Sequence, residues 1–146
     1  AQHFGAALCA FNTLFNLDEG GQRRLFERCG GTLRADGVLV IEALTGEGLG
    51  DGPASSVGVS RLEADALVLA ATVVDADEQT IRGQHVDITE AGIRLRPWRV
   101  RWTTPSQLDD MAADAGLELA ERFEDVTETR FGPDSGRHVS VYRRNR

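Results

Sequence analysis

Two histidines and one aspartate in the chain have residue types suited to metal or acid–base chemistry. His85 and Asp87 are two apart in a predicted strand, so their side chains point to the same face. With the distant His138 they could form the ligand set of two histidines and one carboxylate that binds non-heme iron. Either histidine could instead be a general base that takes a proton from a substrate amine or hydroxyl. The simpler interpretation of each is a polar residue on an exposed strand face.

The segment Phe4 to Leu44 predicts a strand–helix–strand crossover of an open parallel sheet. FGAALCAFNTLF is an apolar strand that runs into a polar-aromatic turn, DEGGQRRLFERCGGTLRADG is a helix, and VLVIEAL is a second buried strand. Leu25, Phe26 and Cys29 lie three and four apart, so one stripe of this helix should face the sheet. Because such a crossover has no place in the all-β barrels that carry iron triads, we expect no metal site.

Glycine-rich stretches separate these elements. We expect Gly30-Gly31 and Asp36-Gly37 to mark the end of the helix. The loop TGEGLGDGPASS after the second strand superficially looks like a phosphate or dinucleotide loop. Pro53 and a pair of serines follow its glycines, and no helix does, so we interpret this loop as a flexible connector.

The part from Val57 to about Thr104 predicts an antiparallel meander. Its pieces are VGVSRLEA, ALVLAATVVD, QTIRGQHVDIT and GIRLRPWRVRWT, with turn residues between them. The last piece alternates apolar residues with arginine, so one face should be buried and the other wet or in contact with a partner. Trp98 and Trp102, with Arg99 and Arg101 between them, predict either a binding or dimer surface or an ordinary amphipathic strand.

A helix and a hairpin close the chain. PSQLDDMAADAG is a helix with Thr104 as its N-cap, Pro105 in its first position and Gly116 at its end. LELAERFEDV and RHVSVYRR are two strands joined through FGPDSG. We expect three aspartates on the solvated face of the helix: Asp109, Asp110 and Asp114.

This order of elements, with CAFNTLFNL after the first strand, TTPSQLDDMAADAGLEL and a final HVSVYRR, resembles the class I S-adenosylmethionine-dependent methyltransferases. The resemblance runs from their fourth strand to their antiparallel seventh. It implies an α/β fold, a partial Rossmann-like sheet made by residues 1–45 and 104–146, with a glycine-rich loop and antiparallel β insertion at 46–103. The insertion is similar to that of methyltransferases that act on amino sugars and other natural-product scaffolds.

The resemblance also implies a cofactor and a site. S-adenosylmethionine would be the cofactor, a small molecule would be methylated on nitrogen or oxygen, and Cys9, Ala10, Phe11 and Asn12 would contact the cofactor. Expected substrate contacts are Thr13, Leu14, Phe15, Glu42 and Trp98. Residues 10–16 could instead be an ordinary strand-to-helix turn with Asn12 as a cap, and the apolar pair within it could pack in the core.

The chain departs from the family in one respect. The glycine-rich cofactor loop and the acidic residue that holds the ribose hydroxyls are missing from these 146 residues. We therefore expect the N-terminal half of the methyltransferase to lie outside the chain, and the chain alone to be inactive. The alternative function is a non-catalytic, dimerising or ligand-binding domain, a truncated methyltransferase relative. An unpaired sheet edge and an exposed apolar face would favour a homodimer or pairing with the missing half.

Composition excludes several other classes. The net charge of −7 argues against nucleic-acid binding, which needs a basic surface. All basic residues are arginine, so Schiff-base chemistry is excluded. The two cysteines, Cys9 and Cys29, indicate free thiols in a reducing compartment rather than a disulfide framework. No long apolar span or signal peptide is present, so we expect a cytoplasmic protein without membrane contact.

Overall fold

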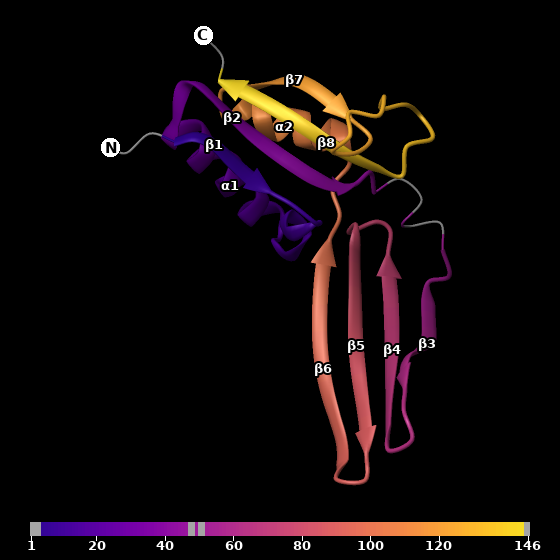
Figure 1. The fold of residues 1–146 in the computed structure, drawn as a ribbon. Coiled ribbons are helices and arrows are strands. Elements are labelled where there is room, and N and C mark those ends of the chain that lie inside the picture. The colour runs from indigo at the N-terminus through magenta and orange to yellow at the C-terminus, as the bar shows by residue number, and fades with distance from the viewer. Residues whose placement is uncertain (1–3, 47–48, 50–51, 145–146) are drawn as a thin grey trace. The chain divides into compact units, whose positions relative to one another are not determined.

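The computed structural model describes residues 4–46, 49 and 52–144. The chain divides into two compact units, Ala1–Glu47 with Trp102–Arg146, and Gly48–Arg101 (Figure 1). The fold is the expected mixed α/β, with two helices and two separate sheets among the described residues.

The first unit is a four-stranded sheet with strand order β1-β2-β8-β7. Its strands are β1 (Phe4–Cys9), β2 (Leu33–Leu44), β7 (Leu117–Phe123) and β8 (Arg137–Arg144). Its helices are the short 3₁₀ helix η1 (Thr13–Asn16), α1 (Glu19–Thr32) and α2 (Pro105–Asp114). β1 and β2 are parallel, whereas β8 is antiparallel to both of its neighbours, β2 and β7. The predicted crossover and closing hairpin are therefore confirmed.

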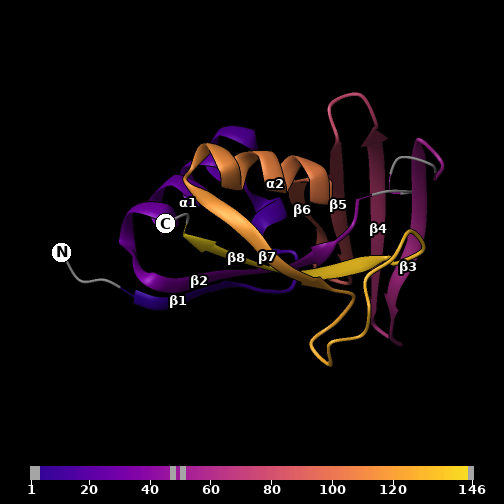
Figure 2. The same ribbon diagram turned by 90° about the horizontal axis from the view of Figure 1, so that it is seen from above.

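Both α helices lie on one face of this sheet (Figure 2). Side chains alternate along β2, and Leu39, Ile41 and Ala43 are all at most 2% exposed. The neighbouring strand β1 presents Leu8 on the opposite face, where it is 70% exposed. β2 is therefore buried on one face and half-buried on the other. The buried face belongs to the packed core, and the other face belongs to the more open side of the sheet.

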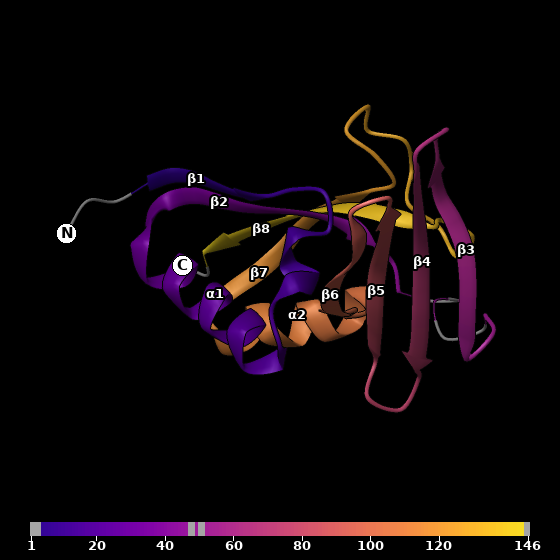
Figure 3. The ribbon, with the colours of Figure 1, turned by 90° about the horizontal axis from the view of Figure 1, so that it is seen from below.

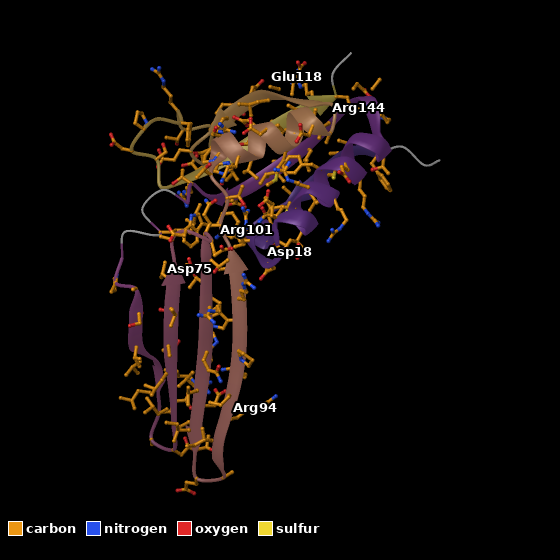
Figure 4. The ribbon with its side chains drawn as sticks, turned by 180° about the vertical axis from the view of Figure 1, so that it is seen from behind. Asp18, Asp75, Arg94, Arg101, Glu118 and Arg144 are labelled. Atoms are coloured by element: carbon orange, nitrogen blue, oxygen red, sulfur yellow. The ribbon has the colours of Figure 1, made fainter. Side chains whose placement is uncertain are left out.

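α1 begins where its sequence predicts and ends later. The Asp18 carboxylate, labelled in Figure 4, accepts a hydrogen bond from the Gly21 N–H and caps the helix. Phe26 is fully buried. The expectation that Gly30-Gly31 ends the helix is wrong, because α1 continues to Thr32 and Asp36-Gly37 belongs to β2.

Gly30 lies where α1 packs closely against the end of α2, and this contact explains why the position holds a glycine. A Cβ atom on Gly30 would overlap the carbonyl oxygen of Ala115, which follows α2 directly. The next residue, Gly31, has open space around it. Gly30 is therefore a contact point between two helices rather than a helix terminator.

α2 begins and ends where the sequence predicts, but one of its aspartates, Asp109, is not free in solvent. Thr104 and Gln107 form a capping box, and Gly116 has a positive φ of 71° after the helix. The expectation that Asp109 lies on the solvated face is wrong. Its carboxylate receives two hydrogen bonds from the Arg122 guanidinium of β7, of 2.6 and 3.2 Å.

The second unit is the predicted antiparallel meander. Its strands are β3 (Ser55–Leu62), β4 (Ala66–Asp75), β5 (Thr80–Thr89) and β6 (Gly92–Arg101), hydrogen-bonded in that order. In β6, the expectation that the apolar side of the alternation is buried is wrong, because Ile93 is 70% and Leu95 is 58% exposed. None of the described helices is long and apolar enough to cross a membrane.

The two adjacent glycines of α1 allow a matched test of this packing. We expect Gly30→Ala to lower the free energy of unfolding by about 1–3 kcal/mol, because the new methyl group overpacks the contact with Ala115. We expect Gly31→Ala to raise it by about 0.5–1 kcal/mol, since alanine stabilises a helix interior where there is room. Urea denaturation of both variants measures the difference, and equal effects would contradict the assigned contact.

Candidate functional site

The carboxyl ends of β1 and β2 meet at one edge of the first unit's sheet, because the two strands are parallel (Figure 3). Ligands of open α/β sheets bind outside this edge. The chain leaves β1 at Cys9 and turns through residues 10–12 into η1. In this turn Phe11 and Asn12 have φ angles of 53° and 57°, so two consecutive non-glycine residues are in the left-handed region.

Hydrogen bonds from the end of β2 hold this turn in place. The Phe11 N–H donates to the Glu42 carboxylate over 3.2 Å, and the Asn12 N–H donates to the Glu42 carbonyl over 3.1 Å. The Asn12 side-chain oxygen accepts a 2.6 Å hydrogen bond from the Leu44 N–H. The structure thus brings together Phe11, Asn12 and Glu42, and we call this arrangement the edge turn.

The edge turn presents an aromatic ring to solvent. The Phe11 side chain is 85% exposed, although an apolar ring gains by burial. Strained backbone and an exposed aromatic ring at a ligand-binding edge are a combination typical of a contact surface. This geometry is what makes the edge turn the candidate site.

The other residues predicted around this site occupy different environments. Thr13 is exposed, Ala10 is half-buried, and Leu14 and Phe15 are buried in the first unit at 0% and 4% exposure. Burial raises the pKa of the Cys9 thiol, so it is protonated and unreactive at neutral pH. Contact of Leu14 and Phe15 with a substrate stays a prediction.

Gln22 is a residue of this region that the sequence analysis missed. It is fully buried in α1, and its side-chain amide donates to the carbonyls of Leu14 and Leu17 at the two ends of η1. Its side-chain oxygen accepts a 2.5 Å hydrogen bond from the buried Thr103 hydroxyl. The sequence could have indicated the burial of Gln22, because Gln22 lies four residues before the apolar Phe26 and so on the same face of the helix.

A second missed feature is a buried polar network that ends at His138. The His138 Nδ1 atom lies 2.8 Å from the Ser140 hydroxyl, which also accepts from Arg122 over 2.7 Å. Arg122 and Tyr142 both donate to Asp109. Burial raises the pKa of the Tyr142 phenol, so this group is a neutral donor throughout the physiological range.

His138 itself is fully buried in β8. Burial, with the positive charge of Arg122 nearby, lowers its pKa from 6.5 to about 4. Its Nε2 atom has no hydrogen-bond partner among the described residues. His138 is therefore a neutral imidazole that is enclosed in the protein at pH 7.

The described residues give the iron hypothesis no support. Within the part of the chain that the structure describes, no group of three His, Cys, Asp or Glu side chains could hold a metal ion. Asp87 instead forms a bidentate ion pair with Arg96, with hydrogen bonds of 2.6 and 2.9 Å. His138 belongs to the first unit, and His85 and Asp87 belong to the second.

The predicted surface around Trp98 and Trp102 draws on residues of both units, and it stays a prediction. Trp98 and Arg99 are neighbours in β6 and so point to opposite faces, and Trp102 is a 4% exposed residue of the first unit. The Trp98 ring lies over Gly83, where a Cβ atom would overlap it. Its centroid is 6.1 Å from that of His85.

Solved structures with the same fold include several methyltransferases. The CcbJ methyltransferase from Streptomyces caelestis is 37% identical and superposes with a TM-score of 0.84 over 99% of this chain and 62% of that one. A methyltransferase from Clostridium acetobutylicum, 8% identical, has a TM-score of 0.81 over 99% of this chain and 60% of that one. CalS10, an amino pentose methyltransferase from Micromonospora echinaspora, is 24% identical, with a TM-score of 0.65 over 99% and 59%.

These comparisons show that the chain has the fold of S-adenosylmethionine-dependent methyltransferases, as the resemblance implies, and that it is similar in sequence to one of them. The chain spans about three fifths of the length of the structures it matches. No family profile matches it, and no curated protein does.

Strain in the edge turn predicts a difference between two substitutions of one residue. Phe11→Gly removes the ring and relieves the left-handed conformation, whereas Phe11→Ala removes the ring and keeps the strain. We expect the glycine variant to be more stable than the alanine variant by about 1 kcal/mol, measured by urea denaturation. An alanine variant of equal or greater stability would contradict the left-handed assignment.

The buried imidazole predicts a pH dependence of stability. Between pH 6.5 and 4 the unfolded chain protonates His138 and the folded chain does not, so the free energy of unfolding falls as pH is lowered through this range. We expect His138→Gln to remove up to about 3 kcal/mol of that fall. Urea denaturation across this range measures it, and His85→Gln, with a half-exposed imidazole, is the control. Parallel curves for wild type and His138→Gln would contradict the assignment.

Proposed function

We propose that the protein containing these residues transfers a methyl group from S-adenosylmethionine to a nitrogen or oxygen of a small molecule. The observation that carries this proposal is the edge turn, at the carboxyl ends of two parallel strands in a fold shared with CcbJ at 37% identity. The shape and position of the turn support a contact with the cofactor, because the ligand of such a sheet lies outside this edge.

The edge turn supplies two kinds of contact suited to such a cofactor. The backbone of Cys9, Ala10 and Phe11 runs along the edge, and hydrogen bonds from the Phe11 and Asn12 N–H groups to Glu42 hold the end of this segment. The exposed Phe11 ring offers a flat apolar surface for the adenosine or methionine part. A positively charged sulfonium is also attracted to an aromatic face. Residues 9–12 are therefore the proposed cofactor contacts.

The cofactor supplies the chemistry when it is bound, an activated methyl group that a nucleophile takes by direct displacement. The protein's own residues then have to position two reactants and exclude water. Thr13, which follows the edge turn, and Glu42, which is part of it, are proposed to contact the substrate. A substrate contact of Trp98, in the second unit, stays a prediction. We propose that further cofactor contacts come from residues outside these 146.

The histidines differ as proposed general bases. His138 is enclosed and has a pKa of about 4, so it is a weak base that a substrate does not reach in the folded unit. His85 is half-exposed on β5 and is the better candidate. A nucleophile that is already neutral, such as an amine with a low pKa, would need neither.

Calorimetric titration with S-adenosylmethionine and S-adenosylhomocysteine tests the proposed contact. We expect Phe11→Ala to weaken binding about tenfold, since a lost ring contact is worth about 1.4 kcal/mol. Phe4→Ala is the matched control, because Phe4 is an exposed ring at the opposite end of β1. Equal weakening by both substitutions would contradict the site.

The same titration separates the proposed function from the alternative of a non-catalytic domain. If neither compound binds to this chain or to a longer protein that contains it, the methyltransferase proposal is wrong. Binding followed by methyl transfer to an amine or hydroxyl compound, detected by mass spectrometry, would support it. The mass of the product also identifies the number of methyl groups added.

A further inference from the structure

One face of the sheet in the second unit has a hollow with a volume of about 550 Å³, and we call it the arginine hollow. Five of the residues that line it are charged or can carry a charge: Arg61, His85, Asp87, Arg94 and Arg96. Its volume is within the range of about 300–1,000 Å³ that small-molecule sites have. The hollow is thus large enough for an organic ligand, and polar groups from several strands face it.

The strand register brings these residues together. One row of directly opposite residues crosses all four strands, from β3 to β6: Arg61, Val68, Asp87 and Arg94. Two positions further along β5 and β6, His85 is opposite Arg96. Because side chains two apart on a strand point to the same face, the polar groups of β5 and β6 share this face of the sheet (Arg94 is labelled in Figure 4).

The lining of the arginine hollow contains three guanidinium groups and one carboxylate. The carboxylate of Asp87 is paired with Arg96 through two hydrogen bonds, of 2.6 and 2.9 Å. The hydrogen bond from Arg96 lowers the pKa of Asp87, and the positive charges of Arg61 and Arg94 lower it further. All three arginines therefore act on the same carboxylate, and only one of them is hydrogen-bonded to it.

The other acidic residues of the sheet leave this excess of positive charge in place. Glu63 pairs with Arg61 over 3.6 Å, but both side chains are more than half exposed, and such surface pairs are weak. Asp65 and Glu90 lie in the two turns at this end of the sheet and do not line the hollow. Three more acids, in the β4–β5 turn region, lie at the opposite end of the sheet: Asp75, Asp77 and Glu78.

Arg94 is the residue of the hollow that most clearly lacks a partner. It makes no hydrogen bond and no ion pair within 4 Å to any residue that the structure describes, whereas Arg96 and Arg61 each have a carboxylate partner. A guanidinium group carries five N–H donors in a planar fork that matches oxyanions. Arg94 thus presents these donors to the hollow beside an ion pair that is already complete.

We propose that the arginine hollow binds the phosphate group of a phosphorylated small molecule. A carboxylate has two oxygens, which one guanidinium fork can satisfy, as Arg96 does for Asp87. A phosphate monoester has three terminal oxygens and a charge of about −1.5 to −2, so it accepts from several donors. Arg61, Arg94 and His85 supply donors from three different strands.

The pairing of Asp87 with Arg96 is what makes the hollow suitable for an anion, because an unpaired carboxylate there would repel one. Every residue involved belongs to the second unit. The phosphate site is therefore independent of the edge turn and of methyl transfer, and its failure would leave the proposed function as it is.

Nuclear magnetic resonance of the His85 imidazole tests the site and its ligand class. We expect phenyl phosphate to shift the His85 resonances saturably, with a dissociation constant of about 1 mM or lower. Benzoate, which presents a carboxylate on the same ring, should bind at least about tenfold more weakly. His85→Gln identifies the resonances. The absence of a saturable shift overturns the site, and equal affinity for benzoate overturns the phosphate assignment.

Three substitutions test the roles of the charged groups in the same titration. Arg94→Gln should weaken phenyl phosphate binding at least about tenfold, since it removes a charge-assisted hydrogen bond. Arg99→Gln is the matched control, because Arg99 is an odd number of positions from Arg94 on β6 and so points to the opposite face. Unchanged affinity in Arg94→Gln, or an equal loss in Arg99→Gln, overturns the proposal.

Asp87→Asn gives a test that misfolding cannot imitate. We expect it to strengthen phenyl phosphate binding several-fold, because it removes the one carboxylate of the hollow and frees the Arg96 guanidinium for the ligand. Weaker binding by a folded Asp87→Asn variant would show that the carboxylate, rather than the arginines, holds the ligand, and would overturn the proposal.

Discussion

The buried side-chain amide of Gln22 connects η1 and α1 with Thr103, which is 81 residues away in the sequence. Because an unsatisfied polar group in the protein interior is costly, Leu14, Leu17 and Thr103 have to remain within hydrogen-bonding distance of it. This requirement sets the path of η1 against α1 and the start of α2, which follows Thr103 directly. The position of the edge turn, immediately before η1, depends on the same contacts.

The edge turn shows how strain is maintained in this fold. Left-handed backbone at Phe11 and Asn12 is unfavourable, and hydrogen bonds from Glu42 and Leu44 on the neighbouring strand compensate for it. The turn is therefore held by contacts within the chain. A contact surface held by its own hydrogen bonds loses little conformational entropy on binding, as the proposed cofactor contact requires.

Side chains alternate between two faces in the sheet of the second unit as well, but the environment of these faces differs from that in the first unit. The first unit buries one side of its sheet under α1 and α2, whereas the four strands of the second unit have no helix of their own (Figure 1). One face of that sheet carries the ion pair of Asp87 and Arg96, and the other face exposes aliphatic side chains such as Val59 and Leu95. Such a sheet gains stability when an apolar surface covers it.

The amino-acid sequence by itself determined the elements and their order. Apolar runs, Thr104 as a cap, and the alternation of β3–β6 are local signals, and local signals suffice for helices and strands. Only the tertiary structure decided which faces are covered and which polar groups meet. Asp109 was predicted to be solvated and is paired with Arg122, and the glycine at position 30 is a helix contact rather than a helix end. Burial and pairing depend on residues from distant parts of the chain, so no local pattern contains them.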